Sequence, residues 1–143
     1  MRALFDVNML LALSDARHPL HERARRWRLE HLGDGGWASC PLTQNGFVRI
    51  ITQHSYPQRL AMPDALAILR QVTARADHAF WPDDVSLVDT AAIDHQRLLG
   101  PRQITGVYLL VLAVKRGGRL VTLDTGISYL AARGATAENL VVV

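Results

Sequence analysis

Short apolar, β-prone segments alternate with helical patterns along the whole chain, and this alternation constrains the fold more than any other feature. The strands are expected at Arg2–Asp6, Trp37–Cys40, His78–Trp81, Arg119–Leu123 and Leu140–Val143. Strands that are connected through helices usually run parallel in one sheet, which helices cover on both faces. The order therefore predicts an α/β/α sandwich with a mainly parallel central sheet, built as a single domain over residues 1–143.

Apolar periodicity and capping residues mark the helical segments between these strands. The helices are expected at Val7–Leu13, Pro19–Leu32, Gln44–Gln53, Asp64–Ala76, Thr90–Leu98, Gly106–Arg116 and Ile127–Ala132. Thr43 and Thr105 each precede one of them, and a threonine hydroxyl can accept from the free amides of a first turn. Gly117 is expected to end the long apolar helix in the left-handed conformation that glycine tolerates.

The composition excludes several classes of protein. With 49% hydrophobic and 20% charged residues, the chain is expected to be a soluble globular domain. The longest apolar run, Val107–Val114, is far shorter than the about 20 residues of a membrane span, so no membrane association is expected. The single cysteine, Cys40, excludes an internal disulfide and fits a reducing compartment. Met1–Leu13 carries an acid at its centre and is a poor signal peptide, so we expect a cytoplasmic protein.

An aspartate ends the first and the fourth expected strand. The segments read MRALFD, ending in Asp6, and RLVTLD, ending in Asp124. Because the carboxyl ends of parallel strands meet at one edge of a sheet, carboxylates at two such ends converge there. The pair predicts a metal site at Asp6 and Asp124. The alternative is that each aspartate caps the helix or turn that follows it.

Two polar residues beside these aspartates are candidates for orienting them. Asn8, in the turn after Asp6, could hydrogen bond the carboxylate or a bound water. Thr122 lies two residues before Asp124, and side chains two apart on a strand point to the same side. We therefore expect Asn8 and Thr122 to support the metal-binding carboxylates without contacting the metal themselves.

Several blocks of sequence resemble PIN-domain ribonucleases and, within them, the VapC-like toxins of bacterial toxin–antitoxin pairs. These blocks are LFDVNMLLAL, HPLHERARRW, GWASCPLTQNGFVRI, FWPDDVSL and RQITGVYLLVLAVKRGGRLVTLD, together with the valine-rich end. The resemblance covers nearly the whole chain and implies a PIN-like fold. It also implies an endoribonuclease that depends on Mg²⁺ or Mn²⁺, forms a homodimer, and is held inactive by an antitoxin bound in or over its active-site groove.

The family carries acidic residues at four positions, and two of them differ here. The first and last acids match Asp6 and Asp124, which the resemblance makes metal ligands and catalytic residues. The second is expected after the threonine of the CPLT block, where this chain has Gln44. The third is expected after the threonine that opens the long helix, where the chain has Gly106. The neutral amide of Gln44 cannot act as a general base, and Gly106 contributes only its backbone.

The basic residues are almost all arginines. Of the sixteen, only Lys115 is a lysine, and the formal net charge is +3. Arginine favours bidentate phosphate contacts, so Arg25 and Arg26 in the expected helix Pro19–Leu32 are candidates for contact with RNA or antitoxin. Arg49, near the second acidic position, is a stronger candidate for a residue beside the groove. A codon bias towards arginine and a solvated helix face are the alternatives.

Two functions of different kinds remain open at this point. One is a metal-dependent endoribonuclease toxin with a depleted acidic site. The other is a relative, impaired naturally or by engineering, that binds antitoxin or RNA without cleaving it. A phosphate-accepting receiver domain also gathers aspartates at strand ends, but it needs paired acids on the first strand and a lysine that ends a strand. Here the first strand has one acid, and Lys115 lies inside a helix.

Overall fold

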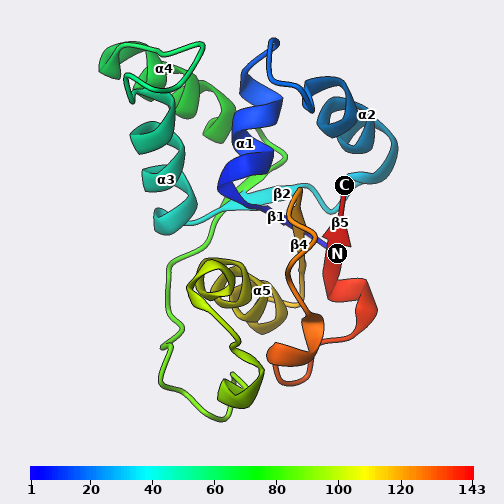
Figure 1. The fold of residues 1–143 in the computed structure, drawn as a ribbon. Coiled ribbons are helices and arrows are strands. Elements are labelled where there is room, and N and C mark those ends of the chain that lie inside the picture. Colours follow the sequence, from blue (N-terminus) through cyan, green and yellow to red (C-terminus); the bar gives the residue numbers. More distant parts are fainter.

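The computed structural model describes all 143 residues and contains one five-stranded sheet. Its strands lie in the order β3-β2-β1-β4-β5, and every neighbouring pair is parallel (Figure 1). The strands are β1 (Ala3–Phe5), β2 (Trp37–Ser39), β3 (His78–Phe80), β4 (Arg119–Thr122) and β5 (Leu140–Val142). The prediction of an α/β/α sandwich is confirmed. The strand at the N-terminus, β1, takes the central place in the sheet.

Helices cover both faces of this sheet. The helices α1 (Val7–Ser14), α2 (His21–His31), α3 (Pro41–Ile51) and α4 (Met62–Thr73) lie on one side, and α5 (Ile104–Lys115) lies on the other (Figure 1). None of them is long and apolar enough to cross a lipid bilayer. Since both faces are covered, the three central strands β1, β2 and β4 are largely buried, which suits their apolar sequences.

Alternation along β1 divides the core into two layers. Phe5 points towards α1 and α2, where its ring lies 6.2 Å from that of Trp27 and 5.4 Å from that of Trp37. Leu4 points to the opposite face and packs in the layer that contains Leu109 and Leu112 of α5. Successive strand residues thus anchor opposite layers, and this fixes the position of Asp6, the next residue in the chain.

Four expectations about helices are wrong. Thr43 lies inside α3 rather than before it: Cys40 is the N-cap, and the Thr43 hydroxyl accepts from the Cys40 amide at 3.0 Å. Thr105 likewise lies within the first turn of α5, which begins at Ile104. In both cases a proline or a turn upstream starts the helix earlier. The segments expected as helices at Thr90–Leu98 and Ile127–Ala132 each form only a short 3₁₀ turn, at His95–Arg97 and Tyr129–Ala131. The left-handed backbone expected at Gly117 is confirmed, with φ of 64°.

Candidate functional site

The two strand-end aspartates follow neighbouring strands. Asp6 comes directly after β1, and Asp124 lies two residues beyond the end of β4. These strands are adjacent and in register, with Phe5 opposite Val121. The Asp6 carboxyl group is buried at 8% exposure, whereas Asp124 is exposed. The fold therefore places a sheltered carboxylate and an accessible one at the same edge of the sheet.

Thr122 connects the two aspartates through hydrogen bonds. Its hydroxyl donates to Oδ2 of Asp6 at 2.5 Å, and its oxygen accepts the backbone amide of Asp124 at 2.9 Å. The Met9 amide donates to Oδ1 of Asp6 at 2.7 Å, so this carboxyl also caps α1. Each oxygen of Asp6 is thus held by one donor, which fixes the orientation of the group.

Burial dominates the titration of Asp6. It raises the pKa of this carboxyl from 3.8 to about 6, although the hydrogen bonds from Thr122 and Met9 act in the opposite direction. The nearby charge of Asp124 raises the pKa further, which is the effect expected of two carboxylates that share a site. A bound cation would remove this repulsion.

The carboxylates also serve as caps, as the alternative hypothesis holds. Oδ1 of Asp124 accepts the Gly126 amide at 2.8 Å, in the turn that follows β4. Capping and cation binding are compatible, because a carboxylate offers about four acceptor positions and capping occupies only part of them. Hard oxygen donors suit Mg²⁺, which often needs only one or two carboxylates and keeps several waters. No group of three or more His, Cys, Asp and Glu side chains forms a larger metal cluster. The donors present therefore fit a weakly held hard cation.

Asn8, expected to help orient Asp6, lies exposed in the first turn of α1. Its side chain makes no hydrogen bond, and Met9 and Thr122 hold the carboxyl instead. Asn8 is therefore free to contact a ligand rather than committed to the carboxylate.

Gln44, at the second acidic position, belongs to a hydrogen-bonded chain that the sequence did not reveal. Its Nε2 donates to Oγ of Ser39 at 2.9 Å, and this Oγ lies 2.8 Å from Nε2 of His78. Burial lowers the pKa of His78, which favours the neutral ring. Ser39 and His78 come from the neighbouring strands β2 and β3, so only the strand order brings them to Gln44. The available signal was one polar residue in each of these short strands, Ser39 as the last residue of β2 and His78 as the first residue of β3.

Gly106, at the third acidic position, faces a side chain that occupies the adjacent space. A Cβ at this position would lie 2.5 Å from Cδ1 and 2.7 Å from Cγ1 of Ile127. Ile127 is buried at 9% exposure and packs in the layer of α5. The place of a third acidic side chain is therefore filled by a hydrocarbon group.

The three candidate arginines separate into two regions. Arg49 lines a hollow of about 610 Å³ between α3 and α4, which Gln44 also lines. Arg25 and Arg26 lie on α2, where both are exposed and Arg25 is 3.8 Å from Glu22. Only Arg49 shares a surface hollow with a residue of the candidate site.

Comparison with known proteins places the chain among relatives of similar length. No protein-family model matches it. It is 49% identical to Ribonuclease VapC44 of Mycobacterium tuberculosis over 140 residues, which cover 98% of each protein. It is 41% identical to Ribonuclease VapC39 of the same organism over 135 residues, covering 94% of this chain and 96% of the relative.

A solved structure shares the fold. The crystal structure of Mycobacterium tuberculosis VapC20, described as a sarcin-ricin loop cleaving toxin, matches with a TM-score of 0.60 at 10% identity. The match covers 85% of this chain and 88% of VapC20. At this level of identity the likeness supports the architecture alone.

Proposed function

The chain belongs to the VapC family of ribonucleases, and on that premise we propose that it is the toxin of a toxin–antitoxin pair and cleaves RNA phosphodiesters with the help of a divalent cation. The observation that most supports this proposal is the link from Asp6 through Thr122 to Asp124 at one edge of the sheet. Met9 holds Oδ1 of Asp6 and Thr122 holds Oδ2, so the buried carboxyl is kept in one orientation beside the exposed Asp124.

In this proposal Asp6 and Asp124 hold Mg²⁺ or Mn²⁺. When bound, the cation would polarise the scissile phosphodiester and lower the pKa of a water for attack. Thr122 and Met9 keep the Asp6 carboxyl in one orientation, so this side chain loses little conformational freedom when a ligand binds. Asp124 is exposed and offers the accessible oxygen.

Substrate and antitoxin contacts are assigned to the hollow between α3 and α4. Arg49 is exposed there and makes no ion pair, so its guanidinium is free for a phosphate or for an acidic segment of an antitoxin.

We also propose a cytoplasmic homodimer. Val88 and Leu99, 81% and 82% exposed, are apolar side chains that a second subunit could cover.

A second candidate function rests on the other two acidic positions. Gln44 is neutral and tied to Ser39, and Ile127 covers Gly106. These features favour a protein that binds RNA or antitoxin with little or no cleavage.

RNA cleavage in Mg²⁺ or Mn²⁺ tests the proposal directly. The Asp124→Asn variant can still accept from Gly126, so the fold should persist while cleavage falls at least about tenfold. Asp34→Asn removes the same charge from an exposed loop and serves as the matched control. Equal cleavage by both variants, or full activity in a chelator, would contradict the proposal. If the unmodified chain is inactive and the Gln44→Glu, Gly106→Asp, Ile127→Ala variant cleaves RNA, the second candidate function is correct.

A further inference from the structure

A second concentration of charged groups lies at the opposite edge of the sheet from Asp6. A cavity of about 680 Å³ is lined by residues of α2, by Leu13 near the end of α1 and by the turn before β3. Asp77 of that turn precedes β3, whereas Asp6 follows β1, and the strands are parallel. We call this hollow the α2 cavity. It belongs to neither the strand-end site nor the hollow beside Arg49.

One carboxylate holds two arginines in place in the α2 cavity. Arg28 of α2 donates from Nη2 to Oδ2 of Asp77 at 3.2 Å, and Arg75 donates from Nε to Oδ1 at 3.3 Å. Although burial opposes it, these hydrogen bonds lower the pKa of Asp77, which therefore stays ionised. A guanidinium has five N–H donors, so each arginine keeps donors for a ligand after binding Asp77. The two groups are thus oriented before any ligand arrives.

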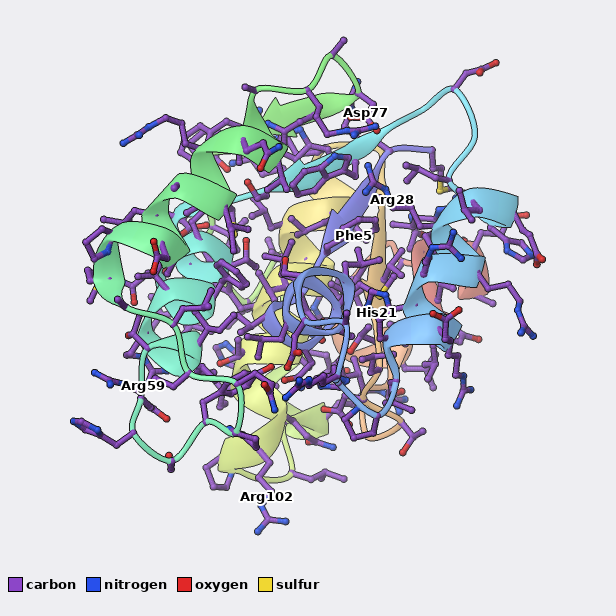
Figure 2. All side chains as sticks on the ribbon, turned by 90° about the horizontal axis from the view of Figure 1, so that it is seen from above. Phe5, His21, Arg28, Arg59, Asp77 and Arg102 are labelled. Carbon is purple, nitrogen blue, oxygen red and sulfur yellow. The ribbon has the colours of Figure 1, made fainter.

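Further donors line the same cavity. Arg25 precedes Arg28 by three residues on α2, so the two lie on one face of the helix. Nδ1 of His21 lies 2.7 Å from the Ala12 carbonyl, which leaves Nε2 as the nitrogen without a hydrogen bond. Figure 2 shows His21 and Arg28 on the inner side of α2, with Asp77 beyond Arg28 at the turn before β3. Three guanidiniums and one imidazole therefore line the hollow, with Asp77 as the one carboxylate among the lining residues. Glu22, beside the hollow, lies 3.8 Å from Arg25 and 3.9 Å from Nε2 of His21.

We propose that the α2 cavity binds a backbone phosphate of RNA, away from the strand-end site. The planar forks of arginine match the several oxygens of one phosphate, and here they converge on one hollow. An acidic peptide would instead present carboxylates in a row and would need arginines in a row. No Phe, Tyr or Trp side chain lines the cavity, so it is suited to the backbone rather than to a particular base. The choice of ligand rests on the proposed RNA substrate, but the site does not depend on cleavage.

Binding of a labelled single-stranded RNA oligonucleotide, measured in a chelator so that no cation takes part, tests this inference. The variant is Arg25→Gln with Arg75→Gln, since both side chains are more than half exposed and can change without loss of packing. The control is Arg23→Gln with Arg70→Gln, which removes the same charge from α2 and α4 outside the cavity. We expect the cavity variant to bind at least about tenfold more weakly than the control. The slope of the logarithm of the binding constant against the logarithm of the salt concentration should also become less steep by about 0.7 to 1.4, because one or two phosphate contacts disappear.

Three results would overturn the inference. Equal losses in the two double variants would mean that only overall charge matters. If the oligonucleotide does not bind the unmodified chain, RNA is not the ligand of the α2 cavity. Retained RNA binding with lost binding of adenosine monophosphate or of poly-glutamate would assign the cavity to a free nucleotide or to an acidic protein segment. Because cleavage is not measured, an inactive strand-end site leaves all these results interpretable.

Discussion

The two halves of the strand-end site are built on different principles. On β1 and β4, Asp6, Thr122 and Asp124 form a connected polar group in which each hydrogen bond has a defined partner. On α3 and α5, the corresponding space holds the neutral amide of Gln44 and the hydrocarbon of Ile127 beside Gly106. One half retains charge at an energetic cost, and the other is filled by groups that stabilise the fold.

This difference shows what a metal site requires of an unliganded protein. Asp6 is buried, so its charge is unfavourable until a cation arrives, and Asp124 adds repulsion. Two further carboxylates at 44 and 106 would increase that repulsion. With Gln44 and Gly106 the site has fewer possible metal ligands, and the unliganded fold has less charge repulsion. Gains in stability often accompany losses of function in this way.

The largest effect should come from neutralising Asp6. The pKa of this carboxyl is 3.8 in the unfolded chain and about 6 in the fold, so the protonated form is favoured by folding. The stability that this group contributes is present below the unfolded value and is lost as the pH rises through the folded value. Asp6→Asn has no charge to lose, and its amide nitrogen can donate to the Thr122 oxygen. We expect the variant to be more stable than the parent by up to about 3 kcal/mol near pH 8.

Urea unfolding across the pH range, without divalent cations, measures this gain. The gain should shrink towards zero as the pH falls from about 6 to about 4, because the parent then becomes protonated as well. Added Mg²⁺ should stabilise the parent but not the variant, since only the parent offers two carboxylates. Asp34→Asn is the control and should show neither trend. A variant that is less stable than the parent near pH 8 would mean that Asp6 is not destabilised by burial.

The two halves of the site also differ in how much of each could be predicted from the sequence. The alternation of apolar runs with helical patterns predicted the parallel sheet, and the aspartates after two of these runs predicted that Asp6 and Asp124 lie at strand ends. Both are properties of local pattern. Strand order is not local, so the chain from Gln44 through Ser39 to His78 could not be predicted. The contact of Ile127 with Gly106 was hidden for the same reason.

Restoring the third acid should strain the packing around α5. The Cβ of Gly106→Asp would lie within 2.7 Å of two carbon atoms of Ile127, so one of the side chains must move. Overpacking of this kind costs about 2 kcal/mol, which we expect as a loss of unfolding free energy. Adding Ile127→Ala opens the space but costs about 2–5 kcal/mol of its own, so the loss in the double variant should be smaller than the sum of the two single losses.

A double-mutant cycle by urea unfolding checks this coupling, and RNA cleavage by the same variants checks its consequence. We expect cleavage to rise at least about tenfold only where the new carboxylate has room, in the double variant. Gly134→Asp introduces the same residue at a surface turn with nothing within 4 Å and controls for added charge, although its φ of 80° brings a backbone strain of its own. Additive losses for Gly106→Asp and Ile127→Ala would show that the two residues do not compete for space.

Removing the hydroxyl that joins the aspartates should have a smaller effect. Thr122→Val keeps the shape of the side chain but removes the donor to Asp6 and the acceptor for the Asp124 amide. We expect a loss of about 1–2 kcal/mol near pH 8 and a further rise in the pKa of Asp6, because its charged form loses a hydrogen bond. Thr122→Ser retains the hydroxyl and should behave like the parent. Carbon-detected NMR titration of the Asp6 carboxyl measures the pKa, and an unchanged value in Thr122→Val would exclude the hydroxyl as an orienting group.

The smallest effect concerns the other half of the site, where a charge at position 44 should be felt at His78. Gln44 donates to Ser39, so the Ser39 hydroxyl can donate to Nε2 of a neutral His78. A glutamate has no donor, and the Ser39 hydroxyl must then turn towards it, leaving Nε2 of His78 to donate to Ser39. The protonated ring and the neutral Nε2–H tautomer can both donate in this way, and the new negative charge favours the protonated ring. Gln44→Glu should therefore raise the pKa of His78 by about half a unit to one unit, whereas the uncharged Gln44→Met should not. Imidazole NMR titration distinguishes the two variants. A rise of the His78 pKa in both variants would mean that the amide merely shields His78 from solvent. A rise in Gln44→Glu alone would show that a charge at the second acidic position acts on His78 through Ser39.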